Sequence, residues 1–259
     1  MNDTSGEGGA SHIHSSMQIF RRSRTMAREY DSFYAGTRLL AYDTEYLDRH
    51  TAAPGRLLDL GCGTGRHVVH FARRGFDVTG IDLSEHMIEE TRKKLSEHGV
   101  GATLAVGDIM DLSALADGSF RYCISMFSTV GLIRGRGNRS ALLREVSRVL
   151  APGGLFLFHV HNRLYNAFEP LGRRWLLFTY LFGPMWNLEV GDKIMDGYRG
   201  IPNMFLHIFS EREVRGLVRA SGLRLVELFR LSRERDRELP GRWARSWRAN
   251  GFLVAARKE

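Results

Sequence analysis

From Gly55 onward, short apolar runs alternate with segments whose apolar residues recur at helical spacing. Runs of five to seven mostly apolar residues, bounded by Gly, Asp or Asn, indicate buried strands. We expect strands over residues 56–60, 76–82, 102–108, 121–127 and 155–161. The segments between them have the pattern of helices, as in residues 139–150, where Leu142, Leu143, Val146 and Val149 share one face. Such alternation predicts parallel βαβ units and a doubly wound α/β sheet.

The alternation stops at Asn162 and resumes near Ser210. Residues 162–209 are rich in aromatic residues and glycine and show no clean period, so we expect an insertion or lid there. Ser210 and Glu213 match a capping box at the start of a helix. Residues 223–231 and 250–258 have the pattern of two closing strands, and Pro152-Gly153-Gly154 indicates a turn.

The chain of 259 residues suits one large domain, which we expect over residues 20–259. The first 19 residues are polar and rich in Gly and Ser. They lack the apolar core of a secretory signal, which predicts a disordered tail. His12 and His14 form an HxH pair in this tail, which makes a poor metal site, and we expect no bound metal.

The composition is ordinary for a globular protein, with 43% hydrophobic and 25% charged residues. The net charge of +8 could attract RNA, an anionic membrane or an acidic substrate, or reflect only a solvated arginine surface. Cys62 and Cys123 form no CxxC pair or disulfide framework, which fits the reducing cytoplasm. The longest apolar run, residues 175–186, is too short to span a bilayer.

The segment LLDLGCGTGRH, residues 57–67, joins the first strand to a helix. A glycine loop at this place lets a ligand approach the backbone and the free N–H groups of the helix start. Two features depart from a dinucleotide-binding loop: Arg66 stands where that fingerprint has its third glycine, and Asp59 would repel a pyrophosphate. A cationic ligand suits Asp59 better. S-adenosylmethionine (SAM) carries an ammonium and a sulfonium and has no phosphate.

Two further acids end the next two strands. Asp82 is placed to accept the hydroxyls of a ribose, with Leu83 and Met87 offering apolar surface to one face of an adenine. Asp108 is placed to accept from the adenine amino group, with Ile109 beside the ring. With the acid of the first strand, all three lie at the carboxyl edge of the sheet, where open α/β folds bind ligands.

Four motifs in order, DLGCGTG, GIDLS, VGD and EVSRVLAPGG, resemble the successive motifs of class I SAM-dependent methyltransferases, in particular the type 11/25-like domain. The resemblance implies a Rossmann-like, doubly wound seven-stranded sheet in the order 3-2-1-4-5-7-6. The last strand would be antiparallel, and a lid would follow strand 5. It also implies SAM as cofactor and S-adenosylhomocysteine as product.

The resemblance assigns roles to residues at this edge. The backbone of the glycine loop would hold the methionine part of SAM, and a residue at the end of the fourth strand would line that part. The implied cofactor contacts are Gly61, Cys62, Gly63, Asp82, Asp108 and Met126. EYDSFY, residues 29–34, is similar to a segment that caps the cofactor, where Tyr30 would bond the cofactor carboxylate. Tyr30 and Tyr34 could equally be packing residues.

Methyl transfer is an in-line displacement that requires no metal, and a hydroxyl nucleophile gains from a general base. His159 and His161 lie on the same face of a strand, and His161 comes last, at the ligand edge. We predict a catalytic or substrate-contacting role for His161, although a satisfied polar strand end remains an alternative. Tyr34, Trp186 and His207 are further substrate candidates. The aromatic residues of 162–209 indicate an apolar pocket, a buried hairpin or an interfacial contact with a membrane.

A small-molecule substrate is the leading interpretation. RNA is the main alternative, because arginines cluster before residue 29 and again between residues 233 and 248, there with Trp243 and Trp247. Acidic residues interleave the second cluster and weaken its field. A non-catalytic SAM-binding regulator on the same fold is the other alternative. The sequence does not indicate the oligomeric state.

Overall fold

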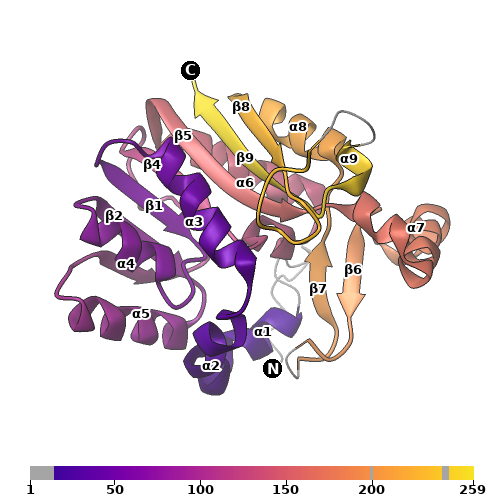
Figure 1. Ribbon diagram of the computed structural model, residues 1–259, viewed down its shortest axis with the longest axis horizontal. Helices are drawn as coiled ribbons and strands as arrows, with labels where there is room; N and C mark the ends of the chain where they lie inside the picture. The colour runs from indigo at the N-terminus through magenta and orange to yellow at the C-terminus, as the bar shows by residue number, and fades with distance from the viewer. Residues whose placement is uncertain (1–14, 199–200, 241–244) are drawn as a thin grey trace, which may run out of the picture.

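The structure, a computed structural model, describes residues 15–198, 201–240 and 245–259. Its centre is a seven-stranded sheet in the order β3-β2-β1-β4-β5-β9-β8 (Figure 1). The sheet strands are β1 (Arg56–Leu60), β2 (Asp77–Asp82), β3 (Thr103–Val106), β4 (Phe120–Ser125), β5 (Leu150–His161), β8 (Leu223–Arg230) and β9 (Gly251–Lys258). The first five are parallel, and β9 runs antiparallel to both β5 and β8. The expected order 3-2-1-4-5-7-6 is confirmed, since β8 and β9 are the sixth and seventh strands of this sheet along the chain.

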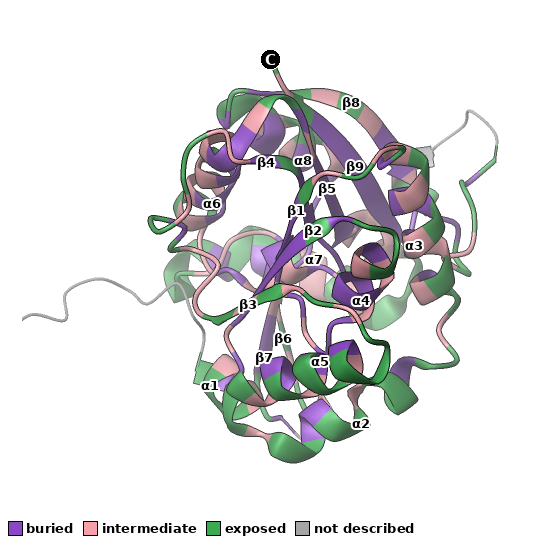
Figure 2. Cartoon of the chain, turned by 90° about the vertical axis from the view of Figure 1, so that its left-hand side faces the viewer, coloured by how far each residue is buried: buried purple, intermediate pink, exposed green. Residues whose placement is uncertain are grey.

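Helices cover both faces of the sheet because its strands are apolar on both sides. One face carries α3 (Arg38–His50), α4 (Arg66–Arg73) and α5 (Glu85–Glu97), and the other carries α6 (Arg136–Val149) and α8 (Glu211–Ala220). In β1, Leu57 packs on the first face and Leu58 on the second. Figure 2 shows the buried strands between helices whose outer surfaces are exposed.

One expected turn lies inside a strand. β5 starts at Leu150, so Pro152-Gly153-Gly154 belongs to it rather than to a turn before it. The pairing with β4 shifts between Phe120 opposite Leu150 and Tyr122 opposite Leu155, which places these residues in a bulge. Gly153 has a φ of +77°, a conformation that a bulge commonly assigns to glycine.

The N-terminal segment is more ordered than its composition indicates. Residues 15–19, which we expected in a disordered tail, form most of α1 (Ser15–Arg22), followed by α2 (Arg24–Tyr34). Two contacts fix α1: the buried Ser16 hydroxyl accepts from Phe205 N–H at 3.3 Å, and Ser84 Oγ donates to Arg21 O at 2.9 Å. Tertiary contacts therefore override the weak local preference for structure. His12 and His14 lie outside the described residues.

Residues 162–209 contribute no strand to the seven-stranded sheet. They contain η2 (Arg163–Phe168), α7 (Pro170–Phe182), η3 (Gly183–Trp186), β6 (Asp192–Met195) and β7 (Met204–His207). The β6–β7 hairpin forms a separate two-stranded sheet, and α7 lies at the side of the molecule (Figure 1). Much of the surface of α7 and η3 is apolar and exposed, including Leu171, Leu177, Tyr180, Leu181, Met185 and Trp186. Within the described ranges, no helix combines the length and the apolar character needed to cross a bilayer.

Candidate active site

A pocket of about 390 Å³ opens at the carboxyl edge of the parallel strands. On one side it is lined by the ends of β1, β2 and β4. On the other side, here called the roof, it is lined by α1, α2 and the β6–β7 hairpin. The expected site residues that line it are Tyr30, Tyr34, Gly61, Gly63, Asp82, Leu83, Asp108, Ile109 and His161. A smaller adjoining pocket of about 60 Å³ shares Tyr30, Tyr34, Gly61 and Gly63 and adds Asp59, Cys62 and Met126. The structure thus brings most of the predicted cofactor residues together.

The three glycines after β1 have different roles, although all have positive φ values. A Cβ on Gly61 would lie 2.5 Å from Thr129 Cγ2, and one on Gly65 would meet the Thr91 side chain. These two glycines allow close packing of η1 (Thr129–Leu132) and α5 on the loop. A Cβ on Gly63 would have no protein neighbour within 4 Å, because this residue borders the pockets. Gly63 therefore leaves room for a ligand.

Arg66, which replaces the third glycine of a dinucleotide fingerprint, anchors the loop to α3. Its guanidinium makes two hydrogen bonds of 2.8 Å to the carboxylate of Asp43, and it donates to Leu40 O at 2.6 Å. Asp43 is buried, which by itself would raise the pKa of its carboxyl, but the nearby His67 and the guanidinium of Arg66 outweigh this effect and lower that pKa. Arg66 thus has a structural role in this fold, because its partner Asp43 lies on α3.

Asp82 joins two elements of the pocket. Its Oδ2 accepts from Gly63 N–H at 2.8 Å, and its Oδ1 accepts from Ser84 N–H at 2.9 Å. Burial raises the pKa of Asp82, and the two N–H donors oppose that rise. Asp108 accepts from Met110 N–H at 2.9 Å and lies at the same end of the pocket. The backbone thus holds both acids in place at the end expected for adenosine.

Asp59 lies beneath the smaller pocket and is 2% exposed. Its Oδ2 is buried and has no hydrogen-bond partner among the described residues. Burial raises its pKa to about 7; Arg66 opposes the shift, and Asp82 and Asp43 reinforce it. An unsatisfied buried carboxylate oxygen fits a cationic ligand group, because such a group would supply both charge and hydrogen bond.

Met87 does not line either pocket, which corrects one expectation. It shares a face of α5 with Thr91, and Thr91 Oγ1 donates to Gly63 O at 2.9 Å. This face packs on the glycine loop instead of opening to the ligand. The apolar surface available to an adenine therefore comes from Leu83 and Ile109.

His159 and His161 lie together on the α3 side of β5, with ring centroids 4.9 Å apart. His159 is fully buried, and burial lowers its pKa to about 4. His161 borders the large pocket, and burial holds its pKa well below the usual value, with His159, Arg235 and Lys193 acting in the same direction. His161 therefore presents a neutral imidazole to the pocket at pH 7.

The roof of the pocket connects α2 to the insertion. The Tyr34 hydroxyl is hydrogen-bonded to the Tyr198 hydroxyl, and the Tyr34 ring packs edge-on against Phe127 at 4.8 Å. Phe127 and Ser128, at the end of β4, have φ values of 57° and 66°. Such strained backbone is typical of functional sites. Phe127, Ser128 and Arg235 also line the pocket and were not predicted from the sequence. For Phe127 and Ser128, the only local signal is their position at the end of a strand, and for Arg235 it is the arginine-rich loop.

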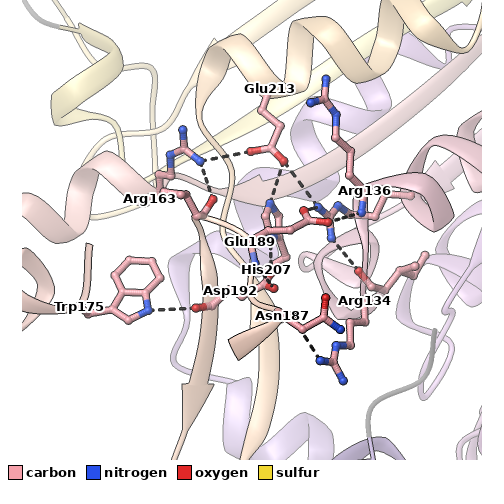
Figure 3. Close-up of polar contacts among 12 residues, drawn as sticks. Arg134, Arg136, Arg163, Trp175, Asn187, Glu189, Asp192, His207 and Glu213 are labelled. Carbon is pink, nitrogen blue, oxygen red and sulfur yellow. Dashed lines mark hydrogen bonds and ion pairs between the residues drawn. The ribbon is translucent and has the colours of Figure 1, made fainter. Parts of the chain in front are cut away.

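His207 and Trp186 do not line the pocket, contrary to their expected role as substrate candidates. Trp186 is 66% exposed on η3. His207 is fully buried, and its Nδ1 and Nε2 bond to Asp192 Oδ1 at 2.6 Å and Glu213 Oε1 at 2.9 Å (Figure 3). Burial alone would lower the pKa of His207, but these two carboxylates raise it. The alternating geometry of β7 turns His207 toward α8 rather than toward the pocket.

This buried cluster fixes the insertion to the main domain. Arg139 of α6 pairs with Glu189. Trp175 Nε1 donates to Asp192 O at 3.0 Å (Figure 3). Glu189, Asp192 and His207 each offer a potential metal-ligating atom, all within 4.8 Å of one another. Arg139 already pairs with Glu189, and His207 already bonds to Asp192, so a network of ion pairs and hydrogen bonds explains the arrangement.

In the first arginine cluster, Arg21, Arg22, Arg24 and Arg28 are exposed on α1 and α2. In the second, Arg235 borders the large pocket. Arg242 and Trp243 lie outside the described residues.

The methyltransferase domain family matches residues 57–154 of the chain. A dTDP-3-amino-3,4,6-trideoxy-alpha-D-glucopyranose N,N-dimethyltransferase of Streptomyces venezuelae is 36% identical over 132 residues, which are 49% of this chain and 53% of that relative. A ubiquinone biosynthesis O-methyltransferase of Xanthomonas euvesicatoria pv. vesicatoria is 34% identical over 127 residues, or 48% and 51% of the two chains. The chain thus spans about half the length of these curated relatives.

Among solved structures, the 1,6-didemethyltoxoflavin-N1-methyltransferase of Burkholderia thailandensis has the same fold. The TM-score is 0.65, the sequence identity is 16%, and the superposition covers 98% of this chain and 93% of that one. The motifs, the sheet order and the glycine loop agree with the family match. Residues 57–154 match a methyltransferase domain, and this match, the related sequences and the sheet order together support a class I SAM-dependent methyltransferase family.

Proposed function

We propose that this protein transfers a methyl group from SAM to an oxygen or nitrogen nucleophile of a small molecule. The observation that carries the proposal is the continuity of the large pocket, which runs from Asp82 and Asp108 to His161. One end has the groups that suit adenosine, and the other has an apolar chamber with a neutral imidazole. Both named curated relatives carry names of small-molecule pathways or substrates, which supports this class of acceptor.

The residues present fit SAM. The unpartnered Oδ2 of Asp59 would hold the ammonium group, and Tyr30, at the junction of the two pockets, would face the carboxylate. Asp82 would bind the ribose, and Asp108 the adenine between Leu83 and Ile109. The open space beside Gly63 accommodates the ligand chain. When bound, SAM supplies a sulfonium-activated methyl group, whose bond to sulfur breaks as the bond to the nucleophile forms, and S-adenosylhomocysteine is released.

The chain itself contributes position, exclusion of water and a proton acceptor. Tyr34 and Tyr198 close the roof, and apolar side chains hold the acceptor in line, an alignment worth up to ~7–11 kcal/mol in ideal cases. For a hydroxyl nucleophile, the neutral His161 accepts the proton as the new oxygen–carbon bond forms. A neutral amine needs no base before attack and loses its proton afterward. We also propose a cytoplasmic location, since Cys62 and Cys123 are free and buried.

The test uses methyl-tritiated SAM, a cell extract as the source of acceptors, and three proteins: wild type, His161→Gln and His98→Gln. His98 is exposed at the end of α5 and serves as the matched control. We expect label in a small-molecule fraction with wild type and His98→Gln. A general base contributes about 10²–10⁴-fold, so His161→Gln should label an oxygen acceptor far more slowly while still binding S-adenosylhomocysteine.

Two other outcomes would contradict the proposal. Label that ribonuclease releases would favour the RNA alternative and give the exposed arginines of α1 and α2 the central role. Binding of SAM without transfer to any fraction would favour a non-catalytic regulator.

A further inference from the structure

Arg235 occupies a constrained position between β8 and α9 (Arg245–Arg248). The loop that carries it is closed by hydrogen bonds from Ser232 N–H to Arg237 O at 2.9 Å and from Leu239 N–H to Arg230 O at 2.7 Å. Arg235 itself has a φ of 60°, an uncommon conformation for a residue other than glycine. The next residue, Asp236, is bound by Arg38 of α3 at 2.8 Å. These contacts hold the loop against the domain and set where Arg235 points.

The side chain of Arg235 borders the large pocket and is half-buried, whereas Arg233 and Arg237 on either side are exposed. Among the described residues, it makes no ion pair and no side-chain hydrogen bond. Burial lowers its pKa, nearby Tyr165 opposes that shift, and a guanidinium stays charged at any physiological pH. A charge withdrawn from water without a partner is unfavourable, so its position calls for an anionic or strongly accepting group.

The other residues of the pocket indicate what kind of molecule would carry the group that Arg235 binds. The pocket that Arg235 and His161 border is also lined by Phe33, Phe127, Met195 and Met204, which offer apolar and aromatic surface. The pocket's two carboxylates, Asp82 and Asp108, are held by backbone N–H groups at the opposite, adenosine end. An acceptor anion would therefore have Arg235 as its partner, in a setting where a charge-assisted hydrogen bond is strong.

We propose that the methyl acceptor is a flat, apolar organic acid whose carboxylate is bound by Arg235, with its nucleophile beside His161. The inference rests on the proposed function and adds the substrate class and a specificity-determining residue. Arg235 borders the large pocket together with His161 and does not line the smaller pocket around Asp59.

The test compares 2-naphthoate with 2-naphthamide, two ligands of the same shape that differ in charge. Each is titrated by calorimetry into protein saturated with S-adenosylhomocysteine. We expect the wild type to prefer the carboxylate about tenfold or more, as a charged hydrogen bond would give. Arg235→Gln should remove this preference, and Arg237→Gln, the exposed neighbour, should retain it.

The outcomes separate this inference from the one on which it rests. Equal affinities in the wild type, a preference that survives in Arg235→Gln, or no binding of 2-naphthoate at millimolar concentration would each overturn the acid-binding role. Each of these results would leave the methyltransferase proposal intact, because S-adenosylhomocysteine binding is measured first in the same samples. Failure of that first titration in the wild type would instead contradict the proposed function. An unchanged affinity of Arg235→Gln for S-adenosylhomocysteine shows that this variant is folded.

Discussion

The backbone N–H of Gly63 donates to Oδ2 of Asp82 over 2.8 Å. This bond joins the loop after β1 to the end of β2, two strands that are parallel neighbours with Asp59 opposite Gly80. The two segments of the expected cofactor site are thus a single unit before any ligand arrives. Such preorganisation means that changes at either residue should affect ligand binding more than they affect folding.

The variant Gly63→Ala should distinguish a loss of space for the ligand from the effect of backbone strain. Its φ of +55° makes alanine unfavourable by about 1–2 kcal/mol, and its Cβ would enter the pocket. Gly75 is the matched control, because it has a φ of +80°, open space around it and no place in either pocket. Urea denaturation should show similar losses for both variants, whereas calorimetry should show weaker S-adenosylhomocysteine binding for Gly63→Ala alone. Equal binding by both variants would argue against a ligand beside Gly63.

Asp59 should make cofactor affinity depend on pH. Its pKa is raised to about 7 in the free protein, and a bound ammonium group would lower it, so binding releases a proton. Affinity for S-adenosylhomocysteine should therefore weaken as pH falls below 7, by up to about tenfold per pH unit. Calorimetry in buffers of different ionisation enthalpy measures the released proton directly. Asp59→Asn should bind weakly at every pH and release none; proton release that persists in this variant would exclude Asp59 as its source.

His207 should stabilise the fold most below neutral pH. Because its folded pKa is raised above the ordinary value near 6.5, its contribution is complete below that pH and is lost as pH rises through the folded pKa. Urea denaturation between pH 6 and 9 should show a steeper loss of stability for wild type than for His207→Gln. His98→Gln, exposed on the surface, should follow the wild type. Parallel curves for all three proteins would contradict a charged His207.

Arg66→Ala should destabilise the protein by about 3–5 kcal/mol, because it leaves the buried carboxylate of Asp43 without its main cation. Adding Asp43→Asn to Arg66→Ala should recover part of that loss, since the unpaired charge disappears. Arg73→Ala, exposed in the last turn of the same helix, is the control and should change stability by less than about 0.5 kcal/mol. A double variant no more stable than Arg66→Ala would show that the pair matters only through packing.

The sequence allowed the sheet and much of the cofactor edge to be predicted. Strand ends such as Asp82 and Asp108 are local features, and apolar runs mark the strands that carry them. Contacts between distant segments were not accessible in this way. His207 looked like a pocket residue until Asp192 and Glu213, both on other elements, were seen to enclose it. Met87 follows Asp82, the acid expected to bind a ribose, along the chain. Its position on α5 nevertheless packs it against the glycine loop.

The N-terminal helix and Arg235 illustrate the same limit. Ser16 and its neighbours have the composition of a tail, and only the contact with Phe205 shows why they are helical. Arg235 was one of several arginines in a polar loop, and nothing local distinguished it from Arg237. Its place beside the pocket depends on the closure of that loop against α3 through Asp236.

The most direct measurement is a calorimetric titration of S-adenosylhomocysteine into wild type, Asp82→Asn and Asp77→Asn. Asp77 begins the strand that Asp82 ends and is largely exposed, so it is a matched control. If the pocket binds this nucleoside through Asp82, wild type and Asp77→Asn should bind one equivalent with similar affinity, and Asp82→Asn should lose about 10-fold or more, as expected when a charged hydrogen bond is removed. Absence of binding by the wild type, or equal binding by Asp82→Asn, would contradict the assignment of this pocket to SAM.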